Sequence, residues 1–337
     1  MATNPPQRHG PRSGSVMEWL LDSDPAIRWQ VLRDLTDTPA ETVASERARV
    51  ASEGWGARLL GLRDQDGQWA GGALFPARGR LSPSDLPIKG QPWIATAYSL
   101  IYLQEFGVDP RADEVRRAVA DVHRHSRWEH AGQPFFSGEV EPCINGMTVV
   151  LGVYFDKDVD AIVTRLLGEQ LEDGGWNCEA ENGSVRSSFH TTIRVLECLL
   201  AHERTIGASA QCTEARRRGE EYLLERNLFR RKSNLGVVDP AWLQFSYPTR
   251  WHYDVLRALE YFRSTGDRPD SRVAEAIELL RSKQQPDGVW LLENTHPGAV
   301  HFALEDGDGR PSRWNTLRAL RVLDWYSAGD ALRGDRV

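Results

Sequence analysis

Two cysteines and a histidine are the side chains of this sequence best suited to metal chemistry. Cys143, Cys178 and His190 offer sulfur and nitrogen ligands, the types that a borderline-soft metal such as zinc prefers. Glu141 or His252 can supply a fourth ligand. Bound zinc lowers the pKa of a thiol or a water, which creates a nucleophile at neutral pH. Because these residues form no local C-x-x-C cluster, the sequence equally allows a small buried Cys143, a loop thiol at Cys178 and a helix-capping His190.

Three side chains are candidates for proton transfer, namely Asp254, His252 and Glu179. Asp254 lies in RWHYDVLR on an apolar predicted helix, where burial without a cation would raise its pKa and suit general acid or base catalysis. The alternative for Asp254 is an ion pair with Arg257 or Arg318. Glu179 lies in a loop just upstream of another predicted helix.

Aromatic side chains are the second feature with functional potential, since the chain contains 12 tryptophans in 337 residues. Aromatic residues near helix starts can line an apolar cavity and face a carbocation or an isoprenoid chain. They can equally fill the space between helices as ordinary core. The candidate cavity-lining residues are Trp29, Trp93, Tyr98, Phe189, Trp251, Tyr253, Trp314 and the adjacent Asn315.

Two internal repeats indicate the elements that must position these residues. The first repeat is RDQDGQW (63–69), QLEDGGW (170–176) and QQPDGVW (284–290), in which Asp-Gly ends a helix with a turn. The second repeat opens six apolar helices, and most of them begin with a proline, which suits the first helical turn. These helices are expected at 24–35, 91–103, 141–155, 187–200, 247–262 and 311–325.

Amphipathic segments alternate with these apolar helices and have apolar residues at helical spacing. They cover 41–61, 111–126, 157–171, 213–228 and 270–284, with room for a sixth near the C-terminus. The sequence therefore predicts an all-α fold of six inner and about six outer helices, without significant β-sheet. Residues 1–15 are expected to be a disordered lead, and residues 16–337 a single domain.

The Q-x-x-D-G-x-W segments resemble the QW motifs of squalene–hopene and oxidosqualene cyclases. From about Asp24 to Trp325 the chain is similar to single-toroid, squalene-cyclase-like bacterial proteins of the terpenoid cyclase and protein prenyltransferase superfamily. This resemblance implies an α/α toroid in which Trp69, Trp176 and Trp290 tie the outer helices together. The D-x-D-D acid motif of the class II cyclases and the D-D-x-x-D diphosphate–magnesium motif are both missing, so the usual triterpene cyclisation is not expected.

A second resemblance, to the protein prenyltransferase β-subunits, concerns zinc. In that family an Asp and a Cys in a D-x-C motif and a His in a Tyr-His-Thr motif bind zinc near the mouth of the toroid. Here Glu141-Pro142-Cys143 opens one inner helix and Phe189-His190-Thr191 opens the next. The resemblance implies zinc ligands at Cys143 and His190 with Glu141 as the oxygen ligand, although Glu replaces Asp and Pro142 lies between Glu141 and Cys143. Cys178, in the loop just upstream of the His190 helix, is the further expected ligand.

Composition narrows the classes of partner. A net charge of −7 gives no domain-wide basic field for nucleic acid. No apolar stretch is long enough to span a membrane, no dinucleotide or phosphate-loop fingerprint points to a nucleotide cofactor, and the N-terminal residues lack the apolar core of a secretory signal. Four cysteines without a compact framework suit a reducing cytoplasm.

Three functions follow as expectations. The first is a terpenoid- or prenyl-type enzyme, an isomerase or transferase, that binds a lipophilic small molecule in the central cavity with zinc assisting at the rim. The second is a zinc-dependent lyase, hydrolase or thiol-directed transferase. The third is a non-catalytic toroid that binds a ligand or a peptide. The sequence leaves a protein partner open.

Overall fold

The computed structural model describes residues 15–80 and 90–334. The predicted lead at residues 1–15 lies outside this part of the chain except for Ser15, whose side chain caps the first helix. The α-helices are α1 (Val16–Leu21), α2 (Pro25–Asp34), α3 (Ala40–Ala48), α4 (Gly54–Leu60), α5 (Thr96–Phe106), α6 (Asp113–His125), α7 (Pro142–Tyr154), α8 (Asp160–Gly168), α9 (Phe189–Ile206), α10 (Ala210–Leu224), α11 (Val255–Thr265), α12 (Ala274–Ser282) and α13 (Arg313–Gly334). The 3-10 helices are η1 (Arg49–Ala51), η2 (Phe135–Ser137), η3 (Cys178–Ala180), η4 (Pro240–Leu243) and η5 (Ser271–Val273).

The described residues contain a single small sheet, in which β1 (Trp290–Leu291) pairs antiparallel with β2 (Pro311–Ser312). The structure is thus predominantly helical, which confirms the predicted all-α class. No helix within residues 15–80 and 90–334 has the length and apolar character needed to cross a bilayer.

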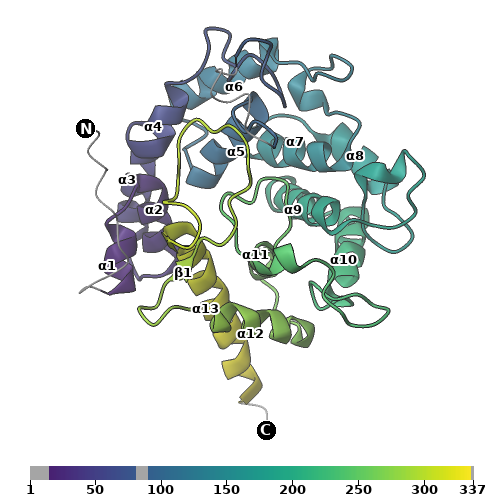
Figure 1. Cartoon of the computed structure of the whole chain (residues 1–337). Helices are drawn as coiled ribbons and strands as arrows, with labels where there is room; N and C mark the ends of the chain where they lie inside the picture. Colours follow the sequence, from purple (N-terminus) through teal and green to yellow (C-terminus); the bar gives the residue numbers. More distant parts are fainter. Residues whose placement is uncertain (1–14, 81–89, 335–337) are drawn as a thin grey trace.

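The six predicted inner helices correspond to α2, α5, α7, α9, α11 and α13. Each contacts the next in chain order, and α13 contacts α2, so the contacts run in a closed cycle. Figure 1 shows α5, α7, α9 and α11 on the inner side, with α6, α8, α10 and α12 farther out. Tertiary contact between the first and last inner helices, which are far apart in the sequence, is what closes this arrangement.

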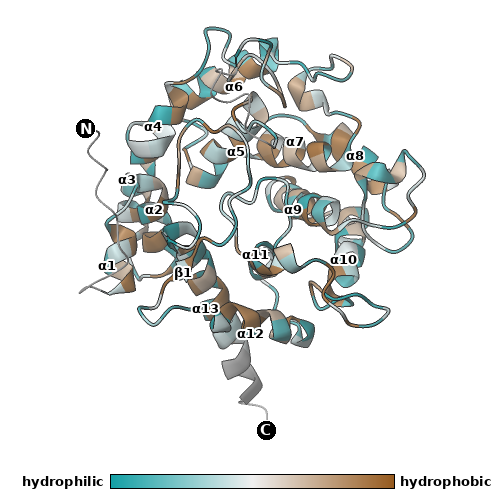
Figure 2. Cartoon of the chain, viewed as in Figure 1, coloured by the Kyte–Doolittle hydropathy of each residue, from teal (hydrophilic) through white to brown (hydrophobic). Residues whose placement is uncertain are grey.

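The predicted outer segments correspond to α3 with α4, α6, α8, α10 and α12. The outer helix α6 is amphipathic and buries Val115, Ala118, Val119 and Val122 on one face, whereas α7 is apolar along most of its length (Figure 2). At the C-terminus, α13 runs as one helix to Gly334 and takes up the segment where a sixth outer helix was left open. A short helix that the sequence did not predict, α1, contacts α2.

Two inner helices begin later than the prolines suggested. The first, α5, starts at Thr96 instead of 91, and α11 starts at Val255 instead of 247. Residues 247–254 form a loop in which Arg250 has a left-handed φ of 58°. Local proline signals therefore marked the segments but not the helix ends, since α11 begins where the Asp254 side chain accepts a hydrogen bond from the Arg257 backbone N–H.

The three repeat tryptophans have the same surroundings, as Trp176 illustrates. Trp176 is fully buried, and its indole N–H donates to the Leu166 carbonyl at 2.7 Å, at the end of the preceding outer helix. Its backbone N–H donates to the Thr192 hydroxyl at 3.0 Å, in the first turn of the following inner helix. Trp69 and Trp290 repeat both bonds, to Leu59 and Thr96 and to Leu280 and Thr316.

These bonds make each repeat tryptophan a link between an outer helix and the next inner helix. An indole N–H in a dry interior needs an acceptor, and the carbonyls at a helix C-terminus lack partners within the helix. The structural role that the resemblance implied for Trp69, Trp176 and Trp290 agrees with these contacts. The threonines that complete the link were not recognised from the sequence.

Candidate functional site

Two cavities lined by the inner helices share Glu105 and Arg194 in their walls. One has a volume of about 410 Å³ and mainly apolar walls. The other, called the charged cavity below, has a volume of about 470 Å³ and many arginines and glutamates in its walls. The apolar cavity contains most of the residues that the sequence associated with metal binding. Buried clefts that combine apolar walls with a few polar groups are the usual form of a small-molecule site.

Three inner helices form the apolar cavity. The body of the cavity consists of Tyr98, Ile101 and Tyr102 of α5 and Ile144 and Met147 of α7. These apolar side chains point inward because α5 and α7 are buried on nearly all sides. The first turns of α7 and α9, together with η3, bring polar groups to one part of the wall.

Glu141, Cys143 and Cys178 form a compact group on that wall. One ligand atom from each lies within 4.8 Å of the other two. Glu141 is the N-cap residue of α7, Cys143 is the second residue of α7, and Cys178 opens η3. The Asn177 side chain caps η3 through the Glu179 backbone N–H, and the Cys178 Sγ lies 3.4 Å from the Thr191 hydroxyl. Both cysteines are thus held at the starts of short helical segments.

The geometry of this group fits a tetrahedral zinc centre. The Cys143 Sγ lies 3.5 Å from the Glu141 Oε2. Zinc bonds of about 2.3 Å to sulfur and about 2.0 Å to oxygen place two tetrahedral ligands about 3.5 Å apart. The donor set of two thiols and a carboxylate also suits this metal. Three protein ligands leave a fourth position, as in catalytic zinc sites.

The two thiols influence each other's ionisation. Hydrogen bonding to Cys178 and burial raise the pKa of the Cys143 thiol well above its usual value. The same contact lowers the pKa of the Cys178 thiol, although burial opposes this effect. Cys178 is therefore the thiol that ionises first in the metal-free protein.

His190 lines the same cavity but stands apart from this group. Its Nδ1 accepts a hydrogen bond from the Tyr253 backbone N–H at 2.8 Å, and burial lowers its pKa to about 4. The ligand group of Glu141, Cys143 and Cys178 does not include His190. The sequence placed His190 in the ligand set because it opens the next inner helix, but the bond to Tyr253 occupies one of its two ring nitrogens.

His252 also differs from its predicted place. Its ring stacks between Trp251 and His296, with centroid distances of 3.7 Å on both sides, and it is not part of either cavity wall. Burial lowers the pKa of His252 to about 3 and that of His296 to about 4. The sequence prediction that His252 is a metal ligand or a catalytic base is thus not supported by its position. His296, which the sequence analysis missed, bonds to the Ser246 hydroxyl at 3.2 Å.

Asp254 is a helix cap. Its carboxylate accepts hydrogen bonds from the Arg257 backbone N–H at 2.7 Å and from the Ser246 hydroxyl at 2.8 Å, and it is 1% exposed. The expected ion pair was wrong, because the Arg257 and Arg318 guanidinium groups bind other carboxylates. Asp254 lines neither cavity, so its position gives no support to the acid–base role.

The predicted aromatic residues divide between the two cavities and the core. Tyr98 and Trp251 line the apolar cavity, together with the candidate catalytic residue Glu179. Trp29 and Trp314 line the charged cavity. Glu179 is an exposed residue of η3, and its carboxylate accepts a hydrogen bond from the Asn182 amide at 2.8 Å.

Four predicted substrate-binding residues belong to the packed core and line neither cavity. The Trp93 indole N–H donates to the Pro297 carbonyl at 2.9 Å, beneath the segment that precedes α13. Phe189 and Tyr253 pack against Trp242 in a cluster of rings. The Asn315 amide donates to the Phe245 and Leu291 carbonyls. The burial of Trp93, Phe189 and Tyr253 agrees with the alternative interpretation of the aromatic residues as core, and Asn315 is buried as well.

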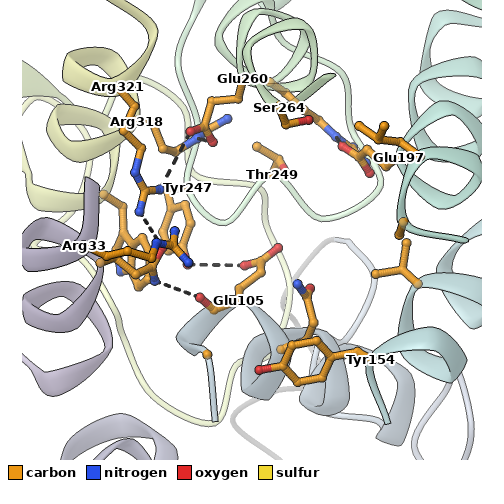
Figure 3. Close-up of a pocket in the computed structure, with 18 of the residues that line it drawn as sticks. Arg33, Glu105, Tyr154, Glu197, Tyr247, Thr249, Glu260, Ser264, Arg318 and Arg321 are labelled. Carbon is orange, nitrogen blue, oxygen red and sulfur yellow. Dashed lines mark hydrogen bonds and ion pairs between the residues drawn. The ribbon is translucent and has the colours of Figure 1, made fainter. Parts of the chain in front are cut away.

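The charged cavity has an organised wall of ion pairs (Figure 3). Arginines and glutamates recur on α9, α11 and α13 at Arg194 and Glu197, Arg257 and Glu260, and Arg318 and Arg321. A pair between neighbouring helices joins Arg318 to Glu260, both labelled in Figure 3. Further pairs join Arg257 to Glu197 and Arg321 to Asp34 of α2. Every arginine that lines this cavity has a partner within the protein. The R-x-x-E spacing at 194–197 and 257–260, followed by R-x-x-R at 318–321, is a sequence signal for this wall that was not recognised.

The chain matches no protein-family model and no curated protein. A function for this protein therefore rests on the geometry of its own residues.

Proposed function

We propose that this protein is a zinc-dependent enzyme of the terpenoid and prenyl type that acts on a lipophilic small molecule in its apolar cavity. The three potential ligands at the wall of that cavity carry the proposal. Glu141, Cys143 and Cys178 present their ligand atoms within 4.8 Å of one another, and the spacing of Cys143 and Glu141 suits a tetrahedral centre.

We also propose that the helices form an α/α toroid of the terpenoid cyclase and protein prenyltransferase kind. The closed cycle of contacts among α2, α5, α7, α9, α11 and α13 supports this architecture. The repeated links of Trp69, Trp176 and Trp290 between outer and inner helices support it as well.

The residues divide the chemistry between them. Zinc at this position would act as a Lewis acid and lower the pKa of a water or thiol in its fourth coordination position. The apolar side chains of α5 and α7 hold the body of the substrate and exclude water from it. A zinc-assisted transferase, lyase or hydrolase agrees with this arrangement better than proton-initiated cyclisation, since Asp254 caps a helix and lines neither cavity.

The test of this proposal is metal content. We expect about one zinc per chain in protein purified without added metal and measured by plasma mass spectrometry. Cys143→Ser and Cys178→Ser should each lose most of the zinc, because removing one thiolate from a site of three protein ligands strongly weakens its affinity for zinc. Cys198→Ala is the matched control, since Cys198 is buried in the core and belongs to no ligand group among the described residues.

Two outcomes would reject the zinc proposal. One is a folded protein with no metal after exposure to zinc. The other is equal retention of zinc in the Cys143, Cys178 and Cys198 variants.

A further inference from the structure

Arg250 is an exception among the buried arginines of the described chain. Its residue is 7% exposed, its Nε and Nη1 have no hydrogen-bond partner, and its side chain has no ion pair among the described residues. The other buried arginines all pair with a carboxylate, and they are Arg194, Arg216, Arg257, Arg318 and Arg321.

The backbone holds Arg250 in the wall of the apolar cavity. Its φ of 58° is unusual for a residue with a side chain, and strain of this kind gathers at functional sites. The Arg194 guanidinium fixes this conformation by donating from Nη2 to the Arg250 carbonyl at 2.7 Å. The Arg250 side chain thus enters the cavity wall from a fixed backbone.

Among the described residues, only aromatic rings stabilise the charge of Arg250. The guanidinium carbon lies 4.8 Å from the Trp93 ring centroid and 5.1 Å from that of Tyr102. Cation–π contacts of this kind offset only part of the cost of burying a charge. Burial lowers the pKa of Arg250 to about 9, so the group still carries its positive charge at pH 7. A buried cation with free donors in a cavity is suited to an anionic ligand.

We propose that Arg250 binds the carboxylate of the substrate, which is a lipophilic carboxylic acid. This inference rests on the proposed function, because it names the substrate class of the same cavity. The hydrocarbon body of the acid lies against Ile101, Tyr102, Ile144 and Met147, which line that cavity.

Tyr98 can supply a second hydrogen bond to the carboxylate. Its hydroxyl accepts from the Gln91 amide at 2.8 Å, which leaves the hydroxyl proton free to be donated. Tyr98 lines the cavity with Arg250. Two donors on one wall are a suitable partner for the two oxygens of a carboxylate.

The charges in the cavity favour a single negative charge over a diphosphate. Arg194, the other cation in the wall, is already paired with Glu197. Glu105, Glu141 and Glu179 also line the cavity. In the metal-free protein a diphosphate would meet one unpaired guanidinium and three carboxyl groups, and the repulsion would outweigh the gain. A monoanion needs only Arg250.

The experiment compares three C15 isoprenoid probes, namely farnesoic acid, farnesol and farnesyl diphosphate, by calorimetric titration of zinc-loaded and metal-free protein. We expect the acid to bind at least about 10-fold more tightly than the alcohol and the diphosphate. Arg250→Met should weaken binding of the acid about 10- to 100-fold, which is the range for a charge-assisted hydrogen bond, and should leave the alcohol unchanged. Arg250→Lys should restore part of the affinity. Arg281→Met, at an exposed ion pair, is the control and should change nothing.

The unfolding temperature of Arg250→Met distinguishes a role of Arg250 in ligand binding from a role in holding the fold together. Without ligand, Arg250→Met should unfold at a higher temperature than the natural protein, because an unpaired buried charge has been removed. The proposal is overturned if the acid and the alcohol bind equally, if the diphosphate binds most tightly, or if Arg250→Met binds the acid as well as the natural protein does. Loss of zinc from Arg250→Met with unchanged acid binding would also overturn it. Binding of the acid to the metal-free protein tests Arg250 without zinc. Failure of the zinc proposal therefore gives a different result from failure of the Arg250 proposal.

Discussion

Arg257 on α11 and Glu197 on α9 form a two-point ion pair, with Nε to Oε1 and Nη2 to Oε2 both at 2.7 Å. Arg257 is 4% exposed, and the pair joins two inner helices that are 60 residues apart. Equivalent pairs join α11 to α13 and α13 to α2. A guanidinium and a carboxylate in this planar arrangement fix both distance and orientation, so these pairs set how the inner helices meet.

The first prediction concerns the stability contributed by this pair. Glu197→Gln should lower the free energy of unfolding by about 2–4 kcal/mol, because the buried Arg257 and Arg194 lose their carboxylate. Glu278→Gln is the matched control, since its pair with Arg281 is exposed and should contribute less than about 1 kcal/mol. Urea unfolding followed by circular dichroism measures both. Equal effects of the two substitutions would contradict this role of Glu197.

The second prediction concerns acid stability. Burial by itself raises the pKa of Glu197, but Arg257 and Arg194 outweigh it, and the pKa lies below its usual value of 4.5. A carboxylate with a lowered pKa binds fewer protons in the folded state than in the unfolded state, so it stabilises the fold above about pH 4.5. That stabilisation disappears as the pH falls through the folded pKa.

We therefore expect the free energy of unfolding to decrease below about pH 4.5, and to decrease less steeply in Glu197→Gln. Urea titrations at a series of pH values between 3 and 6 measure the slope. Parallel curves for the two proteins would show that Glu197 is not the group responsible.

The third prediction concerns the repeat tryptophans. Trp176→Phe should cost about 2–3 kcal/mol, because it leaves the Leu166 carbonyl without its indole donor and opens space in the core. Trp325→Phe is the control, since its indole bonds to the Asp267 carbonyl at the exposed surface and should cost under about 1 kcal/mol. Thermal unfolding measures the difference. Zinc content should stay the same in both variants, and loss of zinc from Trp176→Phe would indicate a role beyond packing.

The fourth prediction concerns His190. Because Glu141, Cys143 and Cys178 gather without it, His190→Ala should retain about one zinc per chain. The substitution should mainly remove the acceptor for the Tyr253 backbone N–H, at a cost of about 1–3 kcal/mol. A comparison of the zinc content of His190→Ala with that of Cys143→Ser tests whether His190 is a ligand. Loss of zinc from both would place His190 in the ligand set after all.

The sequence alone determined the helical class and the places of the main helices. Apolar periodicity and Asp-Gly-x-Trp turns are local properties, since they depend on residues a few positions apart. They correctly located the inner helices from Pro25 to Arg313 and the three buried tryptophans of the repeats. The helix ends were less accurate, as at α11, because the Asp254 side chain caps the helix where the 247–254 loop places it.

The sequence also supplied the right residue types for the candidate metal site, but only the tertiary structure decided which of them meet. Glu141 and Cys143 are neighbours in the chain, whereas Cys178 is brought to them by the packing of α7 against α9. Contact between α9 and the 247–254 loop bonds His190 to Tyr253, and His252 stacks between Trp251 and His296 instead of lining the cavity.

Whether a buried arginine is paired with a carboxylate is the clearest example of a property that the sequence does not determine. Arg250 and Arg257 lie seven positions apart and look alike in the sequence, yet Arg250 has no carboxylate partner among the described residues and Arg257 is bound to Glu197. Pairing depends on which carboxylate approaches in space and on how much water remains, and both are properties of the folded chain. The sequence therefore determined which elements form, and the tertiary structure decided which charges are satisfied and which remain available to a ligand.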